Sequence, residues 1–185
     1  MITVELPEGY LARHERIALE RGAGEFLLPV TIAEEGGRMK LMYRSEGFVA
    51  LGDYGFHGDL YRVFRALKRY AAKIRDAQDM LLRPDRVFVS GDKVFVDAED
   101  QGVRLLYGAN KADGAPGKSI AYGVYTEALI PLLAELSAKA GITGVKAAMT
   151  QLAKKIKTVN PDYETAIKIL ESVERQWNYM QPVGP

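Results

Sequence analysis

Several residue types that carry common chemistry are absent or scarce in this chain. There is no cysteine, which excludes disulfides, thiolate zinc sites and a cysteine nucleophile. The two histidines, His14 and His57, lie far apart with no acidic residue at helical ligand spacing, so no metal site is predicted. Asp97, Glu99 and Asp100 lack the glycine and terminal glutamate of a calcium loop. We expect neither a metal nor a cofactor.

Net charge and long apolar runs are also lacking. With 25 Lys+Arg against 24 Asp+Glu, a net charge of +1 gives no overall reason to expect nucleic acid or an anionic membrane as a partner. The N-terminus shows no signal peptide, and no run approaches the roughly 18 apolar residues of a spanning helix. We therefore expect a cytoplasmic chain. The end, "QWNYMQPVGP", resembles the beginning of a linker, which fits the cytosolic part of a membrane-anchored parent protein.

The apolar pattern predicts an α+β fold class with a β-rich first part. A hydrophobic content of 48% over 185 residues predicts one globular unit, or two small lobes that share a core. Glu34-Glu35-Gly36-Gly37 has the chemistry of a hairpin turn. Short runs of branched and aromatic residues predict strands at 2–6, 10–17, 26–33 and 39–44. Apolar residues at spacings of three and four then predict a helix, packed on one side only, from Gly58 to about Gln78.

The remaining chain is predicted to be mainly helical. Short strands are expected at 86–89, 93–96 and 103–107, and helices at 120–139, interrupted by Pro131, at 145–156, and after 160. In the last helix we expect Asn160 as the cap, Pro161 at the first helical position and Trp177 on the buried face. The predicted organisation is a β-rich lobe, 1–57, and a mainly helical lobe, 58–185, with a short β patch at 86–107, the two forming one compact unit.

The stretch "ADGAPGKS", residues 112–119, resembles a phosphate-binding loop that begins with Ala112 instead of glycine. Such a loop also needs a later apolar strand ending in an aspartate that holds magnesium, and no such strand follows. We favour a surface loop in which Ser119 caps a helix. Gly117, Lys118 and Ser119 remain as the alternative, a nucleotide-binding site of an NTP-dependent protein.

The stretch "DMLLRPDRVFVSGDKVFVDAEDQGVRLLYG", which follows the long predicted helix, resembles the centre of a protein kinase. Residues 83–89 are similar to the Lys-Pro-Glu-Asn-Ile-Leu-Leu part of the catalytic loop, and residues 103–108 to the strand that enters the Asp-Phe-Gly motif. The catalytic aspartate position falls on Leu81 and the metal-binding asparagine on Arg86, while no aspartate precedes Gly108. The resemblance implies a shortened, two-lobed kinase-like fold without phosphoryl transfer.

Two bacterial families share this scaffold and length. The chain resembles the cytosolic N-terminal domain of the EssB/YukC component of type VII secretion, and an uncharacterised domain that precedes forkhead-associated (FHA) domains in Firmicutes. The resemblance implies a non-catalytic, pseudokinase-like interaction or scaffold domain of a secretion or signalling assembly. Its partners would be proteins, including other components of a membrane-associated assembly. The partner's identity and the oligomeric state are left open.

Basic residues form a stripe along the helix predicted after Gly58. Arg62, Arg65, Arg69 and Lys73 lie opposite its apolar face, where they would contact an acidic partner or lipid head groups. The alternative is an ordinary solvated helix face, since amphipathic helices normally carry charge there. These four residues are the partner-binding prediction.

Aromatic residues near the predicted lobe junction admit two interpretations. Tyr43, Tyr54, Tyr61 and Phe64 would line a ligand cleft between the lobes, or would belong to the core. The core is favoured, because large aromatics at such junctions are usually buried.

Overall fold

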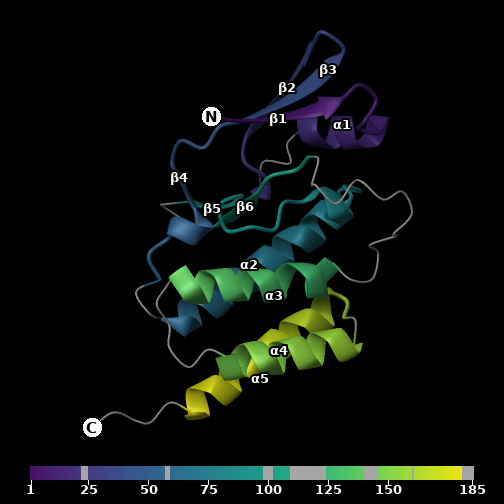
Figure 1. The fold of residues 1–185 in the computed structure, drawn as a ribbon. Helices are drawn as coiled ribbons and strands as arrows, with labels where there is room; N and C mark the ends of the chain where they lie inside the picture. The colour runs from purple at the N-terminus through teal and green to yellow at the C-terminus, as the bar shows by residue number, and fades with distance from the viewer. Residues whose placement is uncertain are drawn as a thin grey trace.

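A computed structural model describes residues 1–21, 25–56, 59–97, 102–108, 124–139, 146–159 and 161–180. These ranges hold two small antiparallel sheets and α-helices, so the predicted α+β fold class is confirmed. The first sheet lies at one end of the molecule, the second sheet lies in the middle, and the last two helices lie at the other end (Figure 1). Buried side chains from both sheets and from the helices form one hydrophobic cluster. The kinase-like arrangement of two lobes stays a prediction.

The first sheet contains β1 (Ile2–Pro7), β2 (Val30–Glu35) and β3 (Arg38–Tyr43) in the order β1-β3-β2, with both pairs antiparallel. Gly36 and Gly37 join β2 to β3 with φ angles of 60° and 73°. Two positive φ angles in a two-residue loop match the turn type that suits the twist of a hairpin. The predicted hairpin is therefore confirmed.

A helix, α1 (Arg13–Arg21), stands where a strand was predicted at 10–17, so that prediction is wrong. Leu11, Glu15, Ala18 and Leu19 are buried, and their spacing is that of one helical face. The buried face includes a carboxylate, which interrupts the apolar period that would have indicated a helix.

The predicted strand at 26–33 is divided between the two sheets at Pro29. Before the proline, the Phe26 carbonyl accepts from the Leu105 N–H at 2.8 Å, and the Leu28 N–H donates to the Leu105 carbonyl at 3.1 Å. After the proline the chain enters β2. Residues 26–28 thus cover one edge of the second sheet and tie it to the first.

The second sheet contains β4 (Phe48–Ala50), β5 (Val94–Asp97) and β6 (Val103–Leu105), in the order β4-β5-β6 and antiparallel throughout. Strand β4 was not predicted from the sequence. Its three residues directly precede a 3₁₀ turn, η2 (Leu51–Asp53), so it is too short to show an alternating pattern.

The predicted strand at 86–89 is also wrong. Its start belongs to a 3₁₀ turn, η3 (Pro84–Arg86), and an isolated bridge joins Val87 to Tyr107. Pro84 favours the turn, because its fixed φ angle suits the first position of a helical turn. The turn directs Arg86 into the interior, where the residue is 7% exposed.

The long helix α2 (Leu60–Asp79) begins close to the predicted position. The Asp59 side chain caps it and accepts from the N–H groups of Tyr61 at 2.9 Å and Arg62 at 3.4 Å. As predicted, the buried residues of α2 lie on one face of the helix, and this wide face contacts β6, η3 and two later helices. Buried Ala66 and Tyr70 widen its packed surface, while Arg62 stays exposed.

Three further helices follow, α3 (Val124–Lys139), α4 (Lys146–Val159) and α5 (Tyr163–Met180). Pro131 lies inside α3 and does not interrupt it, contrary to the prediction. Leu129, Leu132 and Leu133 are fully buried around the proline. Their packing offsets the backbone hydrogen bond that proline cannot make.

The start of α5 differs by two residues from the prediction. Asp162 caps the helix, because its carboxylate accepts from the Thr165 N–H at 2.8 Å, and this hydrogen bond lowers the pKa of Asp162. Pro161 precedes the cap instead of occupying the first helical position, and Asn160 lies outside the described residues. Trp177 is half-buried and packs against the core, on the face where it was predicted.

Candidate functional site

Three of the four predicted partner-binding residues come together on one hollow in the surface. Arg62, Arg65 and Arg69 follow each other at spacings of three and four, which places them on one side of α2. All three line the same hollow, which encloses about 150 Å³. The predicted stripe is therefore an arginine-lined concavity over part of its length.

The floor and walls of this arginine hollow are apolar. Val96 of β5 and Val103 of β6 are cross-strand partners, so their side chains point to the same face of the second sheet. Ala66 of α2 and Leu51 of η2 also line the hollow, and all four of these residues are buried. Sheet and helix thus meet at a small apolar base below the guanidinium groups.

Two aromatic residues complete the wall of the arginine hollow. The rings of Tyr54 and Phe56 lie 5.4 Å apart at 70°, the edge-to-face geometry that aromatic pairs favour. Of the four aromatics proposed from the sequence, Tyr54 lines the hollow, Tyr43 and Phe64 are fully buried, and Tyr61 is exposed. Phe56 carries no distinguishing sequence pattern and was missed.

The positive charges of Arg62 and Arg65 are only partly neutralised by carboxylates of the described residues. The Nε atom of Arg62 lies 3.4 Å from Asp59 Oδ2, in an ion pair whose two side chains are about half exposed. Arg65 is exposed, and the described part of the chain places no carboxylate within ion-pair distance of it. An exposed pair of this kind contributes little to folding, so the guanidinium groups of Arg62 and Arg65 stay available to a ligand.

Lys73, the fourth predicted residue, belongs to a different environment. Its Nζ atom lies 3.1 Å from Asp76 Oδ2 on the next turn of α2, and the residue does not line the arginine hollow. Lys68 likewise has an internal partner, Glu174 of α5, at 2.8 Å. Both lysines stabilise α2 within the fold. The predicted four-residue stripe therefore consists of three arginines that line the hollow and one lysine that does not.

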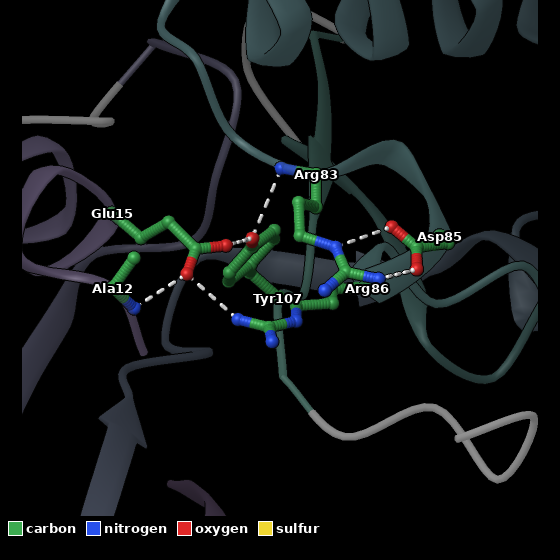
Figure 2. A network of polar contacts seen from close by, with 6 residues as sticks. All are labelled: Ala12, Glu15, Arg83, Asp85, Arg86 and Tyr107. Atoms are coloured by element: carbon green, nitrogen blue, oxygen red, sulfur yellow. Dashed lines mark hydrogen bonds and ion pairs between the residues drawn. The ribbon is translucent and has the colours of Figure 1, made fainter. Parts of the chain in front are cut away.

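A second polar cluster lies in the interior and joins three segments of the chain (Figure 2). Glu15 of α1, which is 1% exposed, accepts from the Ala12 N–H and from Arg86 Nη1, both at 2.7 Å. The Tyr107 hydroxyl also donates to Glu15 and accepts from the Arg83 N–H at 3.0 Å. We call Glu15, Arg86 and Tyr107 the buried network.

Contacts around the buried network fix its geometry further. Tyr43 donates its hydroxyl to the Tyr107 carbonyl at 2.6 Å, and the guanidinium of Arg86 lies 4.2 Å from the ring centre of Tyr10. Burial, together with the hydrogen bond to Glu15, raises the pKa of Tyr107. The network connects α1, η3 and the end of β6 away from solvent, so its role is structural.

Neither Glu15 nor Tyr107 was singled out by the sequence analysis. Glu15 fell in the segment taken for a strand, and its spacing from Leu11 and Ala18 is the one signal that could have placed it on a buried helical face. Arg86 was noted only as the residue at the kinase asparagine position. Its acidic partner lies 71 positions away in sequence, which local patterns cannot reveal.

A larger hollow of about 270 Å³ lies beside the β2–β3 hairpin and is rich in glutamate. Two of the glutamates that line it already have partners, since Glu34 pairs with Arg16, and Glu35 lies 2.5 Å from Lys40. No set of three metal-ligating side chains occurs within the described ranges. This second hollow therefore offers no chemistry beyond ion pairs on an exposed surface.

Most of the other residues weighed in the sequence lie outside the part of the chain that the structure describes. Gly117, Lys118 and Ser119 lie outside the described residues, as do His57, Glu99 and Asp100. His14 is an exposed residue of α1. Among the helices that the structure describes, none is long and apolar enough to cross a membrane.

Comparisons with known proteins give no relative on which to base a function. No protein-family model and no curated protein sequence matches the chain.

Proposed function

We propose that this chain is a non-catalytic protein-interaction domain that binds an acidic segment of a partner protein at the arginine hollow. The observation that carries the proposal is the convergence of Arg62, Arg65 and Arg69 on one concavity with an apolar floor. Arginine offers several N–H donors in a planar fork that suits carboxylates, so three adjacent guanidinium groups favour an anionic ligand.

A protein partner suits this surface better than a lipid head group. Arginine and aromatic residues are enriched at protein interfaces, and both types border the hollow through Arg65, Tyr54 and Phe56. A membrane-binding surface is favoured by a polybasic segment that attracts anionic head groups. Here the neighbouring lysines, Lys68 and Lys73, have acidic partners inside the fold.

The surroundings of Arg86 support a non-catalytic function. In the kinase-like alignment, Arg86 occupies the position of a metal-binding asparagine. Its guanidinium lies against Glu15 and the ring of Tyr10, and it offers no oxygen ligand to the magnesium that phosphoryl transfer requires. With the resemblance to EssB/YukC-type and FHA-associated domains, this arrangement favours a scaffold in a bacterial secretion or signalling assembly, with its partner on the cytoplasmic side.

The proposal is tested by peptide binding. A fluorescently labelled acidic peptide, DEDADED, should bind the wild-type chain, and the triple variant Arg62→Ala/Arg65→Ala/Arg69→Ala should lose most of that affinity. Lys73→Ala is the matched control, since it removes a positive charge from the same helix outside the hollow. Equal binding by the wild type and the triple variant contradicts the proposal.

Two further arms separate the alternatives. The first arm uses vesicles of anionic lipid. If the vesicles bind the wild type more tightly than the triple variant, and the peptide binds both equally, the arginines belong to a membrane-binding surface. Mg-ATP should leave the thermal unfolding temperature unchanged, whereas a ligand at about 100 times its dissociation constant stabilises a fold by roughly 2.7 kcal/mol. A Mg-ATP shift that disappears in Lys118→Ala would replace the interaction proposal with nucleotide binding.

A further inference from the structure

We infer that the arginine hollow receives one aromatic side chain of the acidic segment, so that the recognised motif is an aromatic residue flanked by acidic residues. This inference rests on the proposed function and adds the side chain of the partner that determines specificity. It follows from the size of the hollow, the composition of its floor and the position of its rim.

The size of the hollow selects a single side chain. Sites for drug-sized ligands enclose roughly 300–1,000 Å³, whereas this hollow encloses about 150 Å³. An apolar cavity of roughly 150 Å³ accommodates one benzene ring. The space therefore has the size of one aromatic ring of a partner.

The floor of the hollow gives such a ring an apolar environment. Val96 and Val103 both line the hollow and are 4% and 1% exposed. Val49 of β4 is the cross-strand partner of Val96 and is 40% exposed, which continues the same apolar row to the surface. A ring that enters the hollow can contact this valine row.

The walls and rim favour an aromatic ring over an aliphatic side chain. The edge-to-face pair of Tyr54 and Phe56 can extend to a third ring, which adds attraction beyond the burial of apolar area. A guanidinium group above the ring face supplies a cation–π contact. Arg62, Arg65 and Arg69 line this space, so carboxylates on either side of the ring meet positive charge.

The experiment compares three peptides on one protein. DEDFDED and DEDADED differ only in the central residue, and GSGFGSG keeps the ring without the acids. Burial of one ring should make DEDFDED bind about tenfold or more tightly than DEDADED. The neutral peptide should bind far more weakly than either, because it lacks the partners of the arginines.

A variant that fills the hollow separates the ring from the charges. Ala66→Leu adds apolar volume in the hollow at a helical position that tolerates leucine. It should bring the ratio of the DEDFDED affinity to the DEDADED affinity close to one, because the ring can no longer enter the hollow. Arg65→Ala should weaken the binding of both acidic peptides and keep the ratio of their affinities. Methyl resonances of Val96 and Val103 should shift with DEDFDED and not with DEDADED, which checks the same contact without any substitution.

The possible outcomes distinguish the inference from the proposed function. Equal affinities for DEDFDED and DEDADED, with no shift at Val96 or Val103, overturn the inference and leave the acidic site standing. If DEDADED binds the wild type no more tightly than the triple arginine variant, the proposed function is overturned. A neutral peptide that binds as tightly as DEDFDED contradicts both, since the ring alone would then be recognised.

Discussion

The arginine hollow and the buried network use the same side chain in opposite ways. Arg86 has a side chain that is 9% exposed, and its charge is neutralised by Glu15 at 2.7 Å. Arg65 is exposed on α2, at the rim of a concavity. A buried guanidinium requires a partner within the fold, while an exposed one can stay solvated until a ligand arrives. The number of arginines is thus less informative than the location of their partners.

This difference separates stability from binding. A change in the buried network should destabilise the fold, because it leaves a charge without compensation in the interior. A change at the rim of the hollow should weaken peptide binding and leave the fold intact, since surface substitutions change stability little.

The largest expected effect is on folding. Glu15→Ala removes the partner of Arg86, and breaking a buried ion pair costs about 3–5 kcal/mol. We expect a correspondingly lower free energy of unfolding in urea. Glu20→Ala, an exposed change on the same helix, is the control and should leave the transition in place. An unfolding curve for Glu15→Ala that overlays the wild type would show that the network does not stabilise the fold.

A smaller loss is expected from Tyr107→Phe. The change removes a hydroxyl that donates to Glu15 and accepts from the Arg83 N–H, so one buried acceptor and one donor lose their partner. Unsatisfied buried groups cost about 1–3 kcal/mol. Urea unfolding should show this loss while the affinity for DEDADED stays at the wild-type value. Weaker peptide binding by the folded variant would mean that the two regions are coupled.

The same variant has a pH signature. The folded chain raises the pKa of Tyr107 above its ordinary value of 10.0, so the folded state keeps a proton that the unfolded state loses. The stability from this shift is complete below pH 10.0 and is lost as the pH rises further. Above pH 10.0, the free energy of unfolding should fall less steeply in Tyr107→Phe, by about 1.4 kcal/mol per pH unit. Parallel slopes for the two proteins contradict the assignment.

Single substitutions at the rim should show how much each arginine contributes to peptide binding. Arg65→Ala should weaken DEDADED binding roughly fivefold, near the upper end for an exposed ion pair. Arg62→Ala should cost less, because Arg62 already shares its charge with Asp59. Lys73→Ala should have no effect. Fluorescence anisotropy measures all three, and a loss in Lys73→Ala equal to that in Arg65→Ala would move the site away from the hollow.

Added salt should affect the arginine hollow more than the buried network. Raising the ionic strength from about 0.1 M to 1 M shortens the Debye length from about 10 Å to 3 Å, which screens exposed charges. DEDADED affinity should fall several-fold, while the destabilisation caused by Glu15→Ala should persist, because the buried pair is screened much less. Peptide binding that does not change with salt would argue against recognition by arginine.

The sequence allowed the long helix and the hairpin to be predicted because their signals are local. Apolar spacing placed α2, and Gly36-Gly37 marked the turn. The segment of α1 was misread, since Glu15 on the buried face breaks the apolar period. Strand β4 was missed, because its three residues are held by pairing with β5. Partners distant in sequence decided both cases.

The candidate site shows the same limit. The spacing of Arg62, Arg65 and Arg69 was visible along one helix, and it correctly placed them on one side. The floor of the hollow comes from Val96 and Val103, on strands about thirty to forty residues further along the chain. Whether a basic stripe borders a concavity depends on such tertiary contacts, so the residues could be predicted and the hollow could not.

The most direct test of acidic recognition at the arginine hollow is charge reversal at its rim. Arg65→Glu should retain the wild-type unfolding temperature, because the residue is exposed. The variant should lose affinity for DEDADED and gain affinity for the basic peptide KRKAKRK, both measured by anisotropy at low salt. A variant that is fully folded and keeps the wild-type preference for DEDADED would contradict the account.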